Sequence, residues 1–339
     1  RNVMKINRNL MAIIFIAGSL ALQKGYAEEG FFKPVVDSGH GLSLDVLEKA
    51  VSSSYLIQTS SGELCSINIL SPDGYALTAL HCLSSQLVDK GLAKFETQSV
   101  QGTEMATLEV DPSLITRPNH ISFLMGQSQD TLVPVKALVV LSGERLTYMG
   151  DEKDHISPLP TFKEHTLKKN EDYILLQIIS QDQSYPCIPL VSLTKPEKQE
   201  AVWSIGFPDR AWRSNNQNSD GISQYITHGN IGFNFDNVQW VSELFGVSDP
   251  EIILPIHQVM SDYLIGSQGF ISDLDSISGM SGAMVINSSG ELIGIQTSGF
   301  LEDPSLFTPF TALGLKIQWI SQQISERLGK SYLEKITCK

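Results

Sequence analysis

The sequence predicts an all-β protein, mainly antiparallel, that ends in one α-helix. Short apolar or alternating runs, bounded by Gly, Pro, Asp and Ser, recur from residue 55 onward, as expected for strands joined by tight turns. The last segment repeats apolar residues at helical spacing instead, so one stripe can dock on the body. The chain has 339 residues, of which 42% are hydrophobic and 18% charged, which is enough to bury a substantial core.

The expected elements follow the chain in order, beginning with a short amphipathic helix near residues 42–51. The expected strands cover residues 55–59, 65–70, 75–80, 132–141, 173–179 and 201–205. Residues 283–286 and 291–297 should form a hairpin, because the small polar residues Asn287-Ser288-Ser289-Gly290 between them suit a tight turn.

The terminal helix is expected over residues 312–328, where Leu313, Ile317, Ile320, Ile324 and Leu328 form the apolar stripe. Residues 84–168 and 236–264 are interpreted as insertions, since they are long for connections, and the second has a partly helical pattern.

The amino terminus has the layout of a secretory signal peptide. Lys5 and Arg8 precede an apolar run over residues 10–22, and the small residues Gly25 and Ala27 suit cleavage after Ala27. The run is short for a bilayer span, so an uncleaved anchor is the alternative. No later segment has the length of a transmembrane helix. We therefore expect residues 1–27 to be removed and the protein to be secreted or periplasmic, without contact with a membrane.

The overall charge argues against two classes of partner. A formal net charge of -13 does not favour a sequence-independent grip on nucleic acid or on anionic lipid, because those surfaces attract basic patches. No nucleic-acid partner is expected.

The four cysteines allow two disulfide bridges in an exported chain. Cys65 and Cys82 flank the strand-turn-strand before His81, so a bridge between them would clamp the loop that carries this histidine. Cys187 and Cys338 would then be left to pair. Because the sequence has no Cys-x-x-Cys pair, the spacing supports no zinc site, and we expect no metal or other cofactor.

Gly279-Met280-Ser281-Gly282 is a candidate nucleophile site. A serine hydroxyl needs a base to take its proton, and the tetrahedral intermediate needs donors aimed at its oxyanion. Gly279 would let the backbone turn so that its N–H and that of Ser281 point into one oxyanion hole. Taken alone, such a string is as consistent with an ordinary glycine-serine turn.

His81 and Asp172 are the candidate base and acid. His81 follows a predicted strand, and an imidazole has the pKa best suited to proton transfer near neutral pH. Asp172 opens another predicted strand and could fix the tautomer of His81. Each residue alone could equally be a capping or surface group. Together, the order His, Asp, Ser excludes an α/β-hydrolase, in which a histidine follows the serine, because the last histidine here is His257.

Over residues 52–329 the sequence resembles the trypsin-like serine peptidase family. Thr78-Ala79-Leu80-His81-Cys82 is similar to the family's Thr-Ala-Ala-His-Cys motif, and residues 172–176 to its acid strand. Residues 275–282 resemble its Asp-Ser-Cys-Gln-Gly-Asp-Ser-Gly motif, residues 292–299 its cleft strand, and Trp319-Ile320 a pair in its terminal helix.

Residues 70–75 and 204–208 look like the bacterial, HtrA-related branch of this family. With no room for a following PDZ domain, a lone peptidase domain is expected. The family also differs from this chain in two places. Met280 stands where trypsins carry the aspartate that pairs with a newly cut amino terminus, and no Ile-Val-Gly-Gly start is visible.

The resemblance implies two packed antiparallel β-barrels of the chymotrypsin kind. The implied domains are an N-terminal segment over 28–51 and a peptidase domain over 52–330. Within it, the first barrel covers about 52–182 and carries His81 and Asp172. The second covers about 190–310 and carries Ser281, and the terminal helix covers 312–328.

The resemblance also implies a substrate pocket. Asp275, six residues before Ser281, would favour cleavage after Arg or Lys, although Asp273 lies two residues away and leaves this preference open. Thr297, Gly299 and Ser305 would line the same pocket. The implied function is a secreted serine endopeptidase with protein or peptide substrates. The alternative is a non-catalytic or latent protein that uses the fold for binding, and the sequence does not indicate an oligomeric state.

Overall fold

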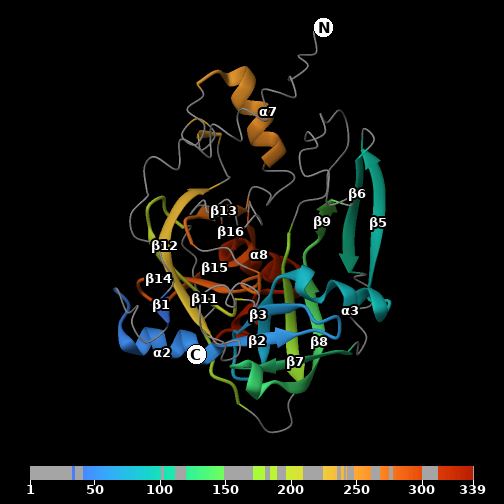
Figure 1. The fold of residues 1–339 in the computed structure, drawn as a ribbon, viewed down its shortest axis with the longest axis vertical. Coiled ribbons are helices and arrows are strands. Elements are labelled where there is room, and N and C mark those ends of the chain that lie inside the picture. Colours follow the sequence, from blue (N-terminus) through green and yellow to red (C-terminus); the bar gives the residue numbers. More distant parts are fainter. Residues whose placement is uncertain are drawn as a thin grey trace.

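The computed structural model contains two β-barrels (Figure 1), which confirms the predicted all-β class with a C-terminal helix. It describes residues 33–34, 41–100, 103–110, 120–148, 171–179, 184–188, 196–208, 224–234, 238–239, 242, 248–260, 268–274, 278–299 and 312–338. The expected signal peptide lies outside the described residues, and so does the bond after Ala27.

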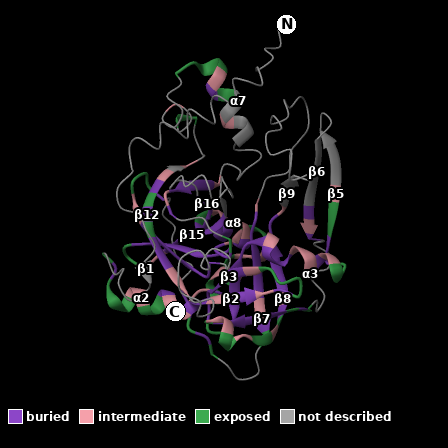
Figure 2. Cartoon of the chain, viewed as in Figure 1, coloured by how far each residue is buried: buried purple, intermediate pink, exposed green. Residues whose placement is uncertain are grey.

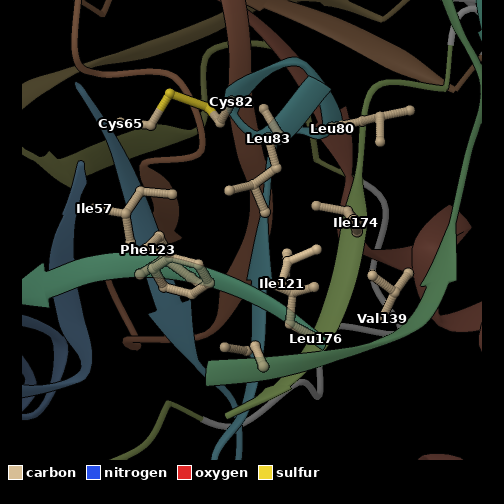
Figure 3. Packing of buried hydrophobic residues seen from close by; sticks show 14 of the residues in the cluster. Ile57, Cys65, Leu80, Cys82, Leu83, Ile121, Phe123, Val139, Ile174 and Leu176 are labelled. Carbon is tan, nitrogen blue, oxygen red and sulfur yellow. A yellow bond between two sulfur atoms is a disulfide. The ribbon is translucent and has the colours of Figure 1, made fainter. Parts of the chain in front are cut away.

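The first barrel is closed by six antiparallel strands. They are β2 (Ser54–Gln58), β3 (Leu64–Ile69), β4 (Tyr75–Thr78), β7 (His120–Gly126), β8 (Val133–Ser142) and β10 (Ile174–Ile179). Their order is β10-β4-β3-β2-β7-β8, and β8 pairs with β10 to close the ring. Figure 3 shows aliphatic side chains and the ring of Phe123 from several of these strands packed in one cluster. Such branched and aromatic residues favour strands that are buried on one face.

The second barrel also has six strands in its ring. They are β11 (Ala201–Gly206), β12 (Tyr225–Asn234), β13 (Gly269–Ser272), β14 (Met284–Asn287), β15 (Leu292–Gly299) and β16 (Ala312–Lys316). The pairing of β12 with β13 closes the ring, and β1 (Lys33–Pro34) pairs with the outer side of β12. The predicted hairpin is present as β14 and β15.

The interpretation of residues 84–168 as an insertion is largely wrong. This stretch supplies β7 and β8 to the first barrel, and their pairing is part of the closed ring. Only β5 (Ala93–Val100), β6 (Thr103–Val110) and β9 (Arg145–Tyr148) form a separate three-stranded sheet. The helix α3 (Ser84–Asp89) leads into this sheet. In the stretch 236–264, α7 (Pro250–Met260) agrees with the helical pattern.

The terminal helix begins later than predicted. Residues 312–316 form β16, which pairs with β13 and β15, so the second barrel extends beyond the predicted end near 310. The helix α8 covers Ile317–Leu328, and α9 covers Lys330–Lys335. Leu313 and Ile317 are both buried. The buried residues of the strand and those of the helix therefore looked like one continuous helical stripe in the sequence. Pairing with β13 and β15 makes residues 312–316 a strand instead.

Figure 2 shows that buried residues fill the strands of both barrels, and a second buried cluster joins the barrels and the terminal helix. It includes Tyr75 and Leu77 of β4, Trp203 of β11 and Ile320 of α8. The helix α2 (Leu44–Ser53), close to the predicted 42–51, packs partly on the same cluster. None of the helices in the described part of the chain has the length and apolar character needed to cross a membrane.

Candidate active site

His81 lies just beyond the end of β4, in the short 3-10 helix Leu80–Leu83. The neighbouring Cys82 is bridged to Cys65 of β3, which confirms the expected bridge (Figure 3). This bond joins the turn that carries His81 to the adjacent strand of the same barrel. The side chain of His81 is 22% exposed, so the imidazole is accessible while its backbone is held in place.

Strand register brings Asp172 to His81. β10 runs antiparallel to β4 with Ile174 opposite Thr78. Asp172 precedes Ile174 by two residues and His81 follows Thr78 by three, so both residues emerge at the same end of the strand pair. The predicted acid and base are therefore neighbours because of the sheet, although 91 positions separate them in the sequence.

Two hydrogen bonds join Asp172 to His81. The backbone N–H of His81 donates to Oδ1 at 2.9 Å, and Nδ1 of the ring lies 2.7 Å from Oδ2. Because an ionised carboxylate only accepts, this contact places a hydrogen on Nδ1. In the neutral ring, Nε2 is then the nitrogen with a free lone pair, which is the form that a general base needs.

The segment around Asp172 is held by the end of β8. Gly143 N–H donates to the carbonyl of Tyr173 at 3.0 Å, and Glu171 N–H donates to the carbonyl of Glu144 at 2.7 Å. A side chain at position 143 would meet the carbonyl oxygen of Glu171 at 1.9 Å, so only glycine permits this approach. Burial raises the pKa of Tyr173, which therefore stays uncharged beside Asp172.

Ser281 lies in a turn between two glycines with positive φ. Gly279 has a φ of +91° and Gly282 a φ of +83°, a region that residues with a side chain rarely adopt. A Cβ on Gly282 would lie 2.2 Å from the carbonyl oxygen of Ser66 and 2.3 Å from Oγ1 of Thr78. The turn therefore packs directly on β3 and β4. Its contact on β4, Thr78, is three residues before His81.

Hydrogen bonds across the barrel interface hold this turn. The backbone N–H of Ser66 donates to the carbonyl of Ser281 at 2.8 Å, and Nδ2 of Asn68 donates to the carbonyl of Gly282 at 2.7 Å. On the other side, Gly282 N–H donates to the carbonyl of Gln296 in β15 at 2.7 Å. The turn that carries Ser281 thus makes hydrogen bonds to both barrels.

The arrangement has the parts of an acyl-transfer site. A buried carboxylate orients an accessible imidazole, and a serine turn lies against the strand that leads to that imidazole. Such a turn can present a hydroxyl and two backbone N–H groups to one carbonyl carbon and its oxygen. The sequence motifs contain His81, Asp172 and Ser281, while the supporting residues Ser66 and Asn68 were missed. Their only signal was polarity at positions inside an apolar predicted strand, 65–70.

The predicted pocket residues are placed less completely. Thr297 is buried in β15, where its Oγ1 donates to the carbonyl of Leu313 at 3.3 Å. Gly299 ends β15 and pairs with Ala312. Asp275 and Ser305 lie outside the described residues, so the predicted pocket remains a prediction.

The second predicted bridge is present, between Cys187 and Cys338. It joins a segment that packs on the first barrel to the end of the chain after α9. Cys65, His81 and Cys82 also present possible ligand atoms within 4.8 Å of one another. Since the two sulfurs of that group are bonded to each other, neither is a thiolate, and the group does not suit a metal.

Comparisons with known proteins give one family. Residues 65–295 match the family described as trypsin-like peptidase domain. A comparison with curated proteins finds no match. Among solved structures, the chain is similar to the serine endoprotease from Yersinia pestis, with 18% identity, a TM-score of 0.40 and 85% of this chain covered. It spans 66% of that protein's length, just under two thirds. It is also similar to Deg5, with 14% identity, a TM-score of 0.45, and coverage of 84% of this chain and 94% of Deg5.

Proposed function

We propose that this chain, which belongs to the trypsin-like peptidase domain family, is a serine endopeptidase whose catalytic triad is His81, Asp172 and Ser281. The observation that carries this proposal is the pair of hydrogen bonds from His81 to the buried carboxylate of Asp172. The close packing of the Ser281 turn on the strand before His81 supports the third member.

In this proposal, Nε2 of His81 takes the hydroxyl proton while Oγ of Ser281 attacks the carbonyl carbon of a peptide bond. The resulting oxyanion accepts hydrogen bonds from the N–H groups of Gly279 and Ser281. His81 then gives the proton to the leaving amine, which departs and leaves an acyl ester on Ser281. A water molecule, deprotonated by His81, hydrolyses that ester and restores the free serine. Asp172 stays ionised throughout and stabilises the imidazolium.

A fluorophosphonate probe tests the triad, because it reacts with an activated serine and stays attached. We expect the mature protein to be labelled and Ser281→Ala not to be labelled. Ser289→Ala is the matched control, since Ser289 is exposed in the β14–β15 turn. Its labelling should equal that of the wild type. A folded wild-type protein without labelling would contradict the triad and favour a latent or binding role.

We further propose cleavage after Arg or Lys, with Asp275 as the recognition group. Asp273, the other candidate, already accepts hydrogen bonds from the backbone and the side-chain amide of Asn230. This supports Asp275 as the carboxylate that serves substrate. With a peptide library, Asp275→Ser should lose cleavage after basic residues, while Asp273→Asn should keep it. An unchanged preference in Asp275→Ser would refute the assignment.

We also propose that the protein is exported and works in the periplasm or outside the cell. The two disulfides support this, because such bonds persist in oxidising compartments. The predicted signal peptide supports it independently. Sequencing the amino terminus of the exported protein should give Glu28 as the first residue. Recovery of the intact chain from the cytoplasm would contradict the proposal.

A further inference from the structure

The geometry points to Ser66 as a positioning residue for the oxyanion hole, acting through its side-chain hydroxyl. Ser66 lies in β3 of the first barrel and is fully buried. It is remote in sequence from the nucleophile turn, and no catalytic motif includes it. The inference rests on the proposed function of Ser281 and names a further residue that this function requires.

All polar groups of Ser66 are engaged. Its Oγ donates to the carbonyl of Gly279 at 3.1 Å and accepts from the backbone N–H of Phe207 at 3.0 Å. Its own N–H donates to the carbonyl of Ser281 at 2.8 Å. Its carbonyl accepts from Oγ1 of Thr78 at 2.6 Å. One residue therefore connects the nucleophile turn, the end of β11 and the strand before His81.

Two of these contacts lie on either side of the backbone that must bind the oxyanion, residues 279–281. The hydroxyl of Ser66 holds the carbonyl of Gly279, and its N–H holds the carbonyl of Ser281. The N–H of Ser281 belongs to the peptide unit between those two anchors, and the N–H of Gly279 is on the same residue as the first. Because each anchored peptide unit is planar, it fixes the Cα atoms at both of its ends. The unit that carries the Ser281 N–H can then only rotate about the axis between its own two Cα atoms, and the Gly279 N–H is restricted at its Cα.

The hydroxyl is the part of Ser66 that can act on the hole specifically. Its proton has one acceptor, the carbonyl of Gly279, since Phe207 uses a lone pair of the same oxygen. Removing the hydroxyl would leave the Gly279 carbonyl without the hydrogen bond from Ser66, while the backbone hydrogen bond from Ser66 to the Ser281 carbonyl remains. An oxyanion donor displaced by about 1 Å costs roughly 100-fold in rate, whereas ground-state binding of the substrate depends on other contacts.

Ser54 provides a matched control. It is also fully buried in a strand of the first barrel, and its Oγ also donates across the interface, to the carbonyl of Ile205 at 3.5 Å. Within the described part of the chain, this hydrogen bond of its side chain goes to β11 and not to residues 278–282. A merely structural role for a buried interface hydroxyl should therefore appear equally in Ser54→Ala and Ser66→Ala.

The test measures peptide hydrolysis and the affinity of a peptide boronic acid, whose tetrahedral adduct on the serine places an oxygen in the oxyanion hole. In Ser66→Ala, we expect kcat to fall about 10- to 100-fold with KM within a factor of two. The boronic acid should lose affinity by a similar factor, since it mimics the intermediate. Ser54→Ala should match the wild type in all three values, even where its melting temperature is lower.

The outcomes separate this inference from the proposed function. Wild-type protein that the fluorophosphonate labels, together with an unchanged kcat in Ser66→Ala, would overturn only the role of Ser66. Equal losses in Ser54→Ala and Ser66→Ala would also overturn it. An unlabelled wild type would overturn the proposed function, and this inference with it.

If Ser66→Ala does not fold, Ser66→Cys supplies the test, with the Cys65–Cys82 bridge checked by mass spectrometry. A thiol occupies the same place but is a weak, longer donor. We expect kcat to fall with KM kept, and a kcat equal to that of the wild type would overturn the inference.

Discussion

The two barrels contribute to the site by different means. The first holds Asp172 and His81 together through strand pairing, a disulfide and two hydrogen bonds that all lie within that barrel. The second presents Ser281 on a turn whose place against the first barrel depends on bonds that cross the interface. The proposed acid–base pair therefore depends on contacts within one barrel, and the alignment of the proposed nucleophile, Ser281, depends on the interface between the barrels.

This difference predicts that substitutions inside the first barrel and substitutions at the interface impair activity in different ways. A change inside the first barrel should impair proton transfer while the turn stays in place. A change at the interface should move the nucleophile while the acid–base pair stays intact. Three single variants and two disulfide replacements test the comparison, and the largest effect is expected for Asp172.

Asp172→Asn should lower kcat by about 10⁴-fold, because an amide in place of the carboxylate favours the wrong tautomer of His81. KM should change little, since the pair does not bind the ground state. Steady-state kinetics on a peptide substrate measure both values. Asp130→Asn, an exposed change in the short helix after β7, removes the same charge and should keep full activity. A loss below 10-fold in Asp172→Asn would contradict the assignment of the acid.

Gly282→Ala should lower kcat by about 100-fold or more, because its Cβ would meet β3 and β4 and push the Ser281 turn away. Gly62→Ala is the matched control. Gly62 also has a positive φ, of +88°, but a Cβ there meets nothing within 4 Å. Both variants should lose about 1–2 kcal/mol from the backbone conformation, measured by chemical unfolding. Equal activities in the two variants would show that the close packing of the turn is not needed.

The two disulfides should also differ in what they support. Replacing Cys65 and Cys82 with serine should cost about 3 kcal/mol of unfolding free energy, from a loop of 17 residues, and should also lower kcat because Cys82 adjoins His81. Replacing Cys187 and Cys338 should cost more, about 5 kcal/mol from a loop of 151 residues, with kcat per folded molecule unchanged. Unfolding curves and active-site titration give the two quantities. The comparison fails if both pairs change kcat equally.

Asp273, in the second barrel, should give the smallest effect. Burial raises its pKa, against the hydrogen bonds from Asn230 that lower it. A raised pKa in the folded state means that its stabilising contribution is complete below the unfolded pKa and is lost as pH rises through the folded value. Asp273→Asn should therefore remove part of the fall in stability that sets in as the pH rises above about 4, the ordinary pKa of an aspartate. An unchanged pH dependence of unfolding would contradict this.

Parts of the fold were predictable because they follow from local patterns. The strand that ends before His81 and the strand that follows Asp172 are short apolar runs between turn residues, and both are present within two residues of the expected bounds. The β14–β15 hairpin was signalled by its turn residues. By contrast, β7, β12, β13 and β16 were not identified, because none of them alternates strictly over its whole length and strand pairing with distant partners supplies their stability.

The sequence by itself determined the family motifs, the order of His81, Asp172 and Ser281, and the cysteines that bridge. Each depends on residue type and spacing along a short segment. Only the tertiary structure decided how the nucleophile turn is supported, since Ser66 and Gly279 are 213 positions apart and meet where the barrels pack. A serine in a strand is chemically ambiguous, because its hydroxyl can serve any neighbouring acceptor. Which acceptor it serves depends on the packing of the two barrels, and no local pattern encodes that contact.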